Sequence, residues 1–316
     1  MSGDKSFHAG ERAVQQWAGE TAIAERNIGM VSDTVIGGAR HFIAQQFMLA
    51  LASIDGAGNL WASLLFGKPG FVHADDGSAV MIDVPLKERD LADPLWDNIS
   101  GQPDLGMLFI ELGSRRRYRV NGSLQRADAD GLEVVIREAY PNCPKYIQRR
   151  HLRQRSAGRP AQAASEGQLL DGTVAAIIAQ ADTIFVASRH AASGADVSHR
   201  GGAPGFARII DRQTLCIPDF KGNSMFNTLG NFEVDPHAGL CIPDFIHGKL
   251  LQLTGTAVIR WDQDDPHNET AGTRRYWEFT VIRWRLRDTP QQLEWEYLDA
   301  SPFNPVITSI APQASA

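Results

Sequence analysis

Short apolar segments separated by glycine-containing turns follow one another along most of this chain. Phe47–Ser53 and Thr183–Ser188 are rich in small and apolar residues, and the turns after them contain Gly56 and Gly194. An apolar segment followed by such a turn is typical of a β-hairpin. Further strands are expected at Val80–Val84, Gly106–Leu112, Arg116–Val120, Thr214–Pro218, Gly239–Phe245 and Leu250–Thr254. This pattern predicts a mainly β chain that forms an antiparallel barrel or sandwich.

Helices are a minor part of the prediction. Glu11–Trp17 and Arg40–Phe47 are expected to form short helices near the N-terminus. Leu169–Ala181 carries apolar residues at helical spacing and predicts a third helix.

Part of the sequence occurs twice. Pro-Gly-Phe at 69–71 recurs at 204–206, and Ser63 recurs as Ser198, each displaced by 135 positions. Gly106 finds its counterpart in Gly239, now displaced by 133 positions. Solenoid and propeller repeats recur every ~20–50 residues, so a shift this long indicates a duplicated domain. We therefore expect two copies of one fold that pack on each other as a pseudo-dimer.

The length of the chain agrees with a duplication. At 316 residues, two domains of ~150 residues each are expected. The predicted division is 1–150 for the N-terminal helices and first barrel, 151–168 for a linker, and 169–316 for the second barrel. Residues 156–165 are rich in Ala, Ser, Gly and Pro, which is typical of a linker.

Composition excludes several classes of function. The net charge of −6 argues against a nucleic-acid partner, because binding to phosphate backbones depends on positive charge. The three cysteines have no paired ligand spacing, so no metal site or disulfide framework is expected. The N-terminus is polar and no apolar run approaches the ~20 residues that span a bilayer, so we expect no membrane partner and a cytoplasmic location.

The two copies differ where a single working site is expected to lie. Leu64-Leu65 follows Ser63 in copy one, whereas His199-Arg200 follows Ser198 in copy two. His199 would point away from Ser198 and Arg200 on a strand, and we expect it to be a hydrogen-bonded structural histidine.

A second difference lies in the next loop. Copy one has the charged sequence Lys-Glu-Arg-Asp at 87–90, whereas residues 221–227 of copy two contain no acidic residue and many hydrogen-bond donors. A phosphate dianion needs Arg or Lys for charge and hydroxyl, amide or N–H groups for direction, so this loop with Arg200 predicts a phosphate site. The alternative is that its Asn, Ser and Gly residues only form turns.

Five segments make the chain recognisable: FHAGE at 7–11, PGF at 69–71, AYPNCPKYIQ at 139–148, ASRH at 187–190 and GNSMFNTLGN at 222–231. With these the chain resembles the pyridoxamine 5′-phosphate oxidase-related proteins, and more narrowly the branch built from tandem FMN-binding split barrels. In that family a split barrel dimerises and holds FMN in the groove between subunits. The resemblance implies two fused split barrels, with the equivalent groove between the halves of this chain.

Site residues follow from the resemblance together with the difference between the copies. The strand after the first hairpin, the next loop and helix, and a later strand supply the flavin ligands in the family. The expected cofactor-binding residues are Ser198, Arg200, Lys221, Asn223, Ser224, Asn227, Gln252 and Arg119, which is the copy-one counterpart of Gln252. No catalytic side chain is assigned. The chain lacks the arginine- and lysine-rich phosphate motif and the C-terminal substrate segment of true pyridoxamine oxidases, so oxidation of vitamin B6 is not expected.

The function implied is an FMN-dependent oxidoreductase. Electrons would pass from NAD(P)H, or from a reductase, through FMN to oxygen or a small-molecule acceptor. One alternative is a non-catalytic flavin-binding or haem-binding protein, with His190, His199 and His237 as candidate haem ligands; another is a partner subunit of a separate reductase. A homodimer of the whole chain is expected from the resemblance.

The sequence allows two locations for three arginines at alternate positions. Arg115, Arg117 and Arg119 would share one face of a strand. They could line the flavin groove opposite Arg200, or form the outer face of a barrel. Cys143 could lie near the flavin or be buried and inert.

Overall fold

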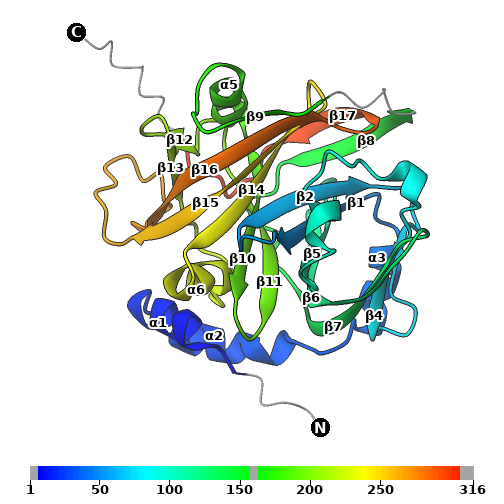
Figure 1. The fold of residues 1–316 in the computed structure, drawn as a ribbon. Helices are drawn as coiled ribbons and strands as arrows, with labels where there is room; N and C mark the ends of the chain where they lie inside the picture. Colours follow the sequence, from blue (N-terminus) through cyan, green and yellow to red (C-terminus); the bar gives the residue numbers. More distant parts are fainter. Residues whose placement is uncertain (1–5, 157–162, 307–316) are drawn as a thin grey trace.

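The strands form two antiparallel sheets with the same connectivity. The computed structural model describes residues 6–156 and 163–306. The first sheet has the order β2-β1-β5-β6-β7-β4-β3, and the second has the order β11-β10-β14-β15-β16-β13-β12, with β9 added beside β16 (Figure 1). The first sheet comprises β1 (Met48–Ile54), β2 (Leu60–Phe66), β3 (Val72–His73), β4 (Ala79–Ile82), β5 (Asp104–Glu111), β6 (Arg116–Ala127) and β7 (Leu132–Pro141).

The second sheet repeats the first strand by strand. It comprises β10 (Thr183–His190), β11 (Gly194–Gly201), β12 (Arg208–Ile209), β13 (Thr214–Pro218), β14 (His237–Asp244), β15 (Lys249–Arg260), β16 (Tyr276–Asp288) and the added β9 (Ser165–Gly167). The register repeats as well, because Ala52 is paired with Gly106 and Ala187 with Gly239. The predicted duplication of a mainly β fold is confirmed.

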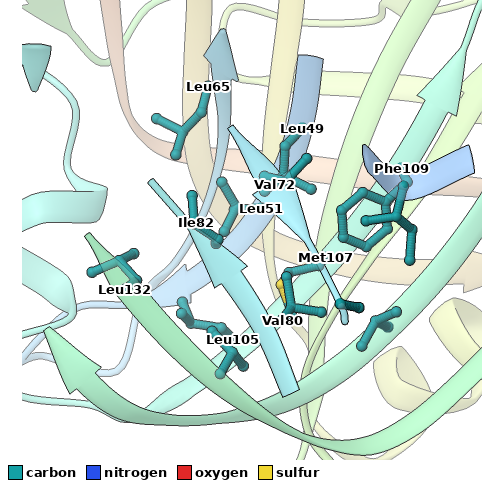
Figure 2. Close-up of a cluster of buried hydrophobic side chains, with 14 of the residues drawn as sticks. Leu49, Leu51, Leu65, Val72, Val80, Ile82, Leu105, Met107, Phe109 and Leu132 are labelled. Carbon is teal, nitrogen blue, oxygen red and sulfur yellow. The ribbon is translucent and has the colours of Figure 1, made fainter. Parts of the chain in front are cut away.

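Each sheet curls around a core of its own. In the first copy, Leu49, Leu51, Val80, Met107 and Phe109 point into one buried cluster (Figure 2). Within the described residues, the two ends of the hydrogen-bonded path, β2 and β3, are not paired with each other. The sheet is therefore a split barrel, closed by side-chain packing where the ladder stops. The second copy encloses an equivalent core around Val186, Leu240 and Trp277.

The two barrels pack face to face through their first hairpins. Alternate residues of β1 point away from their own core, and Ala50 and Ala52 lie with Phe185, Ala187 and Val197 of the second copy in a third buried cluster. All residues of β1 and β2 are buried, since one face of the hairpin covers its own barrel and the other face covers the second barrel. This packing of the two hairpins forms the predicted pseudo-dimer.

Two equivalent glycines permit the close approach of the barrels. A Cβ on Gly106 would lie 2.7 Å from the Cα of Asp196, and a Cβ on Gly239 would lie 2.5 Å from the carbonyl oxygen of Leu60. The first contact joins β5 to β11, and the second joins β14 to β2. Each therefore reaches the second strand of the opposite copy. The pair therefore marks a pseudo-two-fold axis between the barrels.

Short helices lie outside the barrels. They are α1 (Ala9–Trp17), α2 (Thr21–Asn27), α3 (Gly37–Ala44), α4 (Leu95–Asn98), α5 (Gly172–Gln180) and α6 (Asn227–Val234), with 3₁₀ turns at Ile28–Met30 and Leu86–Glu88. The three helices expected from the sequence correspond to α1, α3 and α5. None of the helices in the described ranges is both long and apolar enough to cross a membrane.

A two-stranded ribbon joins the end of the first copy to the C-terminal region. β8 (Arg149–Ser156) pairs with β17 (Gln292–Asp299), supported by ion pairs of Arg149 with Asp299 and of Arg153 with Glu296. The segment 151–168, expected to be a linker, thus includes most of β8 and all of β9, while residues 157–162 lie outside the described residues. The polar sequence of β8 has no apolar face that would mark it as a strand.

We predict that Gly106→Ala destabilises the protein. The new methyl group would overlap the backbone of β11, and overpacking of this kind typically costs about 1–3 kcal/mol. The measurement is urea unfolding, with Gly29→Ala as the matched control, because nothing lies within 4 Å of a Cβ at Gly29. Equal stability of the two variants would contradict the close packing of the barrels at this point.

Candidate functional site

A pocket lined by three arginines lies where the two copies meet. Arg117 and Arg119 come from β6 of the first barrel, and Arg200 comes from β11 of the second. The N-terminal end of α6 lines the opposite wall, and the cavity measures about 80 Å³. The alternation along β6 places Arg117 and Arg119 on one face, as expected. Arg115 is not part of the pocket, because its guanidinium is paired with Asp299.

Two of these guanidiniums have no carboxylate partner within ion-pair distance in the described part of the chain. Arg119 is paired with Asp196 at 3.3 Å. The Nε of Arg117 donates to the carbonyl oxygen of Cys143 (2.5 Å), and Nη1 of Arg200 makes a long contact of 3.4 Å to the carbonyl oxygen of His199. The pocket therefore holds an excess of positive charge.

Burial lowers the pKa of two of the arginines. Burial, reinforced by the neighbouring charges of Arg119 and Arg200, lowers the pKa of Arg117 to about 9. Burial also lowers the pKa of Arg200, although Asp219 opposes the effect. Uncompensated charge in a buried place is unfavourable, and a bound anion would offset it through charge-assisted hydrogen bonds.

Several polar atoms around the pocket have no hydrogen-bond partner among the described residues. They are Nε of Arg119, Nε of Arg200 and Oδ1 of Asn142. Buried polar atoms are nearly always paired in native proteins, so a group of three such atoms around one cavity indicates a ligand. Two of the three are donors, as an anion requires.

The N-terminus of α6 adds further donors. Phe226, in the left-handed conformation at φ 60°, precedes the helix and makes no side-chain cap. Asn227, Thr228 and Leu229 of the first turn line the pocket. The first N–H groups of a helix have no partner within it, and the helix dipole favours negative charge at this end. Helix and arginines therefore point to the same kind of ligand.

Five of the eight predicted site residues line this pocket: Arg119, Arg200, Asn223, Ser224 and Asn227. Ser198 lies directly behind it, with its Oγ accepting a hydrogen bond of 2.9 Å from Thr228. The hydroxyl and amide groups of the loop are turned toward protein partners, since Ser224 donates to Glu20 and Asn227 donates to Glu11.

The other two predicted residues, Lys221 and Gln252, also lie outside the lining of the pocket. Lys221 is exposed, and its carbonyl oxygen accepts a hydrogen bond from Tyr146. Gln252 is fully buried on the other side of the pseudo-two-fold axis, where its Nε2 donates to Ala62 and Ser63 of the first barrel. Asn142 and Thr228 were not predicted; the resemblance segments contained both, but nothing in their local sequence marks them as pocket residues.

The three candidate haem histidines have different surroundings. The prediction of a hydrogen-bonded His199 is wrong, because neither ring nitrogen has a partner and the ring packs edge-on against Phe185. Burial holds the pKa of His199 well below its usual value, so the ring is neutral. His190 stacks on His8, and His237 is bonded to Asp235. Among the described residues, no group of three or more His, Cys, Asp or Glu side chains is arranged to hold a metal ion.

The N-terminal helix holds the pocket loop in place. His8 begins α1, where its Nδ1 accepts from the N–H of Gly10, and its Nε2 lies 3.0 Å from Oδ1 of Asn231 on α6. Gln15 donates to the carbonyl oxygen of Met225 at 3.0 Å. The FHAGE segment is thus explained as the part of α1 that docks on α6 and its preceding loop.

Larger cavities adjoin the charged pocket. One of about 440 Å³ shares Arg117 and Asn142 with it and is lined by Phe42, Tyr118 and Pro141 among others. Another of about 240 Å³ shares Asn227. The charged pocket is small enough for a phosphate-sized group, and the space beside it is large enough for more of a ligand.

Comparison with known proteins gives partial structural matches only. No family model matches the sequence, and no curated protein matches it. Among solved structures, HupZ of Group A Streptococcus is 15% identical with a TM-score of 0.30, over 36% of this chain and 97% of that chain. A pyridoxamine 5′-phosphate oxidase-related, FMN-binding protein from Nostoc punctiforme is 9% identical with a TM-score of 0.28, over 41% of this chain and 96% of the other. An FAD-binding protein from Mesorhizobium loti is 7% identical with a TM-score of 0.28, over 40% and 99%.

One of these structures is a member of the family that the sequence resembles. Each match covers less than half of this chain. At such TM-scores they add nothing to the description of the site. The assignment of two copies depends on the repeated strand order and register of the chain itself.

We predict that Gly10→Ala loosens α1 from α6. A Cβ at this position would lie 2.1 Å from the carbonyl oxygen of Gly230, so the helices would have to separate. Amide hydrogen exchange along α1 should become faster, with a loss of about 1–3 kcal/mol in unfolding free energy. Gly37→Ala, where nothing lies within 4 Å, is the control. Unchanged exchange in α1 would refute this docking contact.

We predict that Glu11→Gln changes the pH dependence of stability. Burial between α1 and α6 raises the pKa of Glu11 from 4.5 to about 7. The folded state therefore holds this proton more tightly than the unfolded state, and the stability that it contributes is lost as pH rises from 4.5 to 7. The difference in unfolding free energy, variant minus wild type, should rise across this interval. A difference that is constant with pH would show that Glu11 is ionised throughout.

Proposed function

We propose that the chain binds a flavin mononucleotide through its phosphate in the charged pocket and acts as an FMN-dependent oxidoreductase. The observation that carries the proposal is the pair of guanidiniums, Arg117 and Arg200, that have no ion-pair partner in the described residues beside the uncapped N-terminus of α6. A phosphate dianion matches this arrangement in charge and in number of acceptors.

The surrounding space supports a nucleotide rather than a free ion. The adjoining cavity of about 440 Å³ falls within the ~300–1,000 Å³ range of small-molecule sites, and Phe42 and Tyr118 offer it aromatic surface. The resemblance of the sequence to FMN-binding split barrels supports FMN as the nucleotide. Both walls of the charged pocket come from one chain, so binding of the phosphate needs no second copy.

The protein groups have defined tasks in this proposal. Arg117, Arg119 and Arg200 neutralise the phosphate, and the N–H groups of α6 orient it. Asp196 holds the guanidinium of Arg119 in place from the opposite strand. The N-terminal helix fixes the loop through Gln15 and Glu11. When bound, FMN would supply the redox chemistry for transfer of electrons from NAD(P)H or a reductase to oxygen or a small acceptor.

The first experiment is the visible absorption spectrum of the purified protein, followed by mass identification of the released ligand and by steady-state oxidation of NADH and NADPH. Released FMN together with turnover supports the whole proposal. Released FMN without turnover leaves a flavin-binding protein that does not accept electrons from these donors. A protein that neither carries nor takes up FMN contradicts the proposal.

We predict that Arg200→Ala and Asn223→Ala each weaken FMN binding. Loss of a charge-assisted hydrogen bond at Arg200 should lower affinity by roughly 10- to 100-fold, and loss of the loop amide should have a smaller effect. Equilibrium dialysis with FMN measures both, with Arg212→Ala as a control at an exposed arginine of the same copy.

The same Arg200 variant separates a ligand-binding role from a structural one. Because Arg200 has no carboxylate partner in the described chain, its removal should leave the unfolding free energy of the ligand-free protein within about 0.5 kcal/mol of wild type or above it. Lower stability with unchanged FMN affinity would show that Arg200 supports the fold and not the ligand.

A further inference from the structure

The pseudo-two-fold axis generates a second groove, between β15 of the second barrel and β2 of the first. Strand register identifies its equivalent residues. Ser63 is paired with Leu51 as Ser198 is paired with Val186, which makes the two serines equivalent. In the same way, Gln252 in β15 corresponds to Arg119 in β6, since their partners Cys241 and Leu108 are 133 positions apart.

An arginine from β16 fills this second groove. Arg287 is paired with Leu250, two residues before Gln252. Its Nε donates to Oε1 of Gln252 at 2.9 Å, and its other nitrogens are ion-paired with Asp90 and Asp93. The side chains of Arg287 and Asp93 are only 2% and 1% exposed, so the groove is closed to solvent at this point.

Asp90 and Asp93 supply the negative charge in this groove. Asp93 accepts a hydrogen bond of 2.5 Å from Ser63 and another of 3.0 Å from the N–H of Leu95, the first residue of α4. The corresponding helix α6 has no side-chain cap, and its first turn lines the charged pocket. Asp93 therefore accepts hydrogen bonds from the N-terminus of α4 and from Ser63. A bound anion would make contacts of this kind in the other groove.

The two grooves also differ in how many of their buried polar atoms have hydrogen-bond partners and in how many of their arginines are paired with carboxylates. Among the described residues, none of the buried atoms without partners belongs to Ser63, Asp93, Gln252 or Arg287. The first groove has three arginines, and within residues 6–156 and 163–306 only Arg119 of these is paired with a carboxylate. Within the described residues, the protein satisfies the polar groups of one groove and leaves some of those in the other without partners.

We propose that the chain binds one phosphate-bearing ligand and not two, because Asp90 and Asp93 occupy the second groove as an internal replacement for the anion. This inference rests on the proposed function for the identity of the ligand. It implies that removing both carboxylate charges creates a second anion site, built on Arg287.

The test is the stoichiometry of binding, measured by equilibrium dialysis of the full chain with FMN and, separately, with inorganic phosphate. Wild type should bind one equivalent per chain. The double variant Asp90→Asn/Asp93→Asn should bind a second equivalent of phosphate, and the further change Arg287→Met in that background should abolish it. Two equivalents in wild type, or one in the folded double variant, would overturn the proposal.

A measurement on wild type alone covers the case in which the double variant does not fold. Phenylglyoxal modifies accessible arginines, and peptide mass mapping locates the modified sites. Arg117 and Arg200 should react without FMN and be protected by it, whereas Arg287 should remain unmodified in both cases. Reaction of Arg287 that FMN prevents would overturn the proposal. If the protein binds one equivalent of inorganic phosphate but does not bind FMN, the proposed function is contradicted and the inference of a single anion site still stands.

Discussion

The packing of the two first hairpins, β1-β2 on β10-β11, is the contact on which the rest of the structure depends. It buries the outer faces of strands whose inner faces already cover a barrel core. Full burial of each large apolar side chain contributes about 1.5–3 kcal/mol, so a cluster of this size holds the copies in one arrangement. Where the hairpins end, a strand of one copy lies beside a strand of the other, and this creates two equivalent grooves.

The two grooves have equivalent backbones but differ in whether their arginines are neutralised by carboxylates. In one groove Arg287 is neutralised by Asp90 and Asp93, and all the polar atoms of Ser63 and Gln252 are used. In the other groove two guanidiniums have no carboxylate partner in the part of the chain that the structure describes. The first arrangement suits stability, because buried charge is tolerated when it is paired and hydrogen-bonded. The second arrangement is unfavourable unless an anion arrives, which is the usual relation between stability and function at a binding site.

The N-terminal helices connect the site to the rest of the chain. Close contact of α1 with α6 at Gly10 and Gly230 brings Glu11 to the amide of Asn227 and Gln15 to the carbonyl of Met225. The loop that lines the pocket is therefore held from outside by a segment more than 200 residues earlier in the sequence. A disturbance of that segment would change the pocket without touching either barrel.

Local patterns in the sequence were sufficient for the repeat, for many of the strands and for α1, α3 and α5, because hairpin turns and apolar periodicity depend on neighbours in the chain. They did not mark α2, α4 or α6, nor the long strands β7 and β16. The difference between the two copies led to Arg200 and the loop 221–227, and the resemblance to split-barrel proteins led to Arg119. They could not separate Gln252 from Arg119, or show that Arg287 closes the second groove, because those contacts join residues far apart in the sequence. The strand β8 was missed for a related reason: its ion pairs with β17 exist only when two polar segments, more than 130 residues apart, are brought together. Pairing of distant strands, and the charge that it leaves uncompensated, is a property of the folded chain.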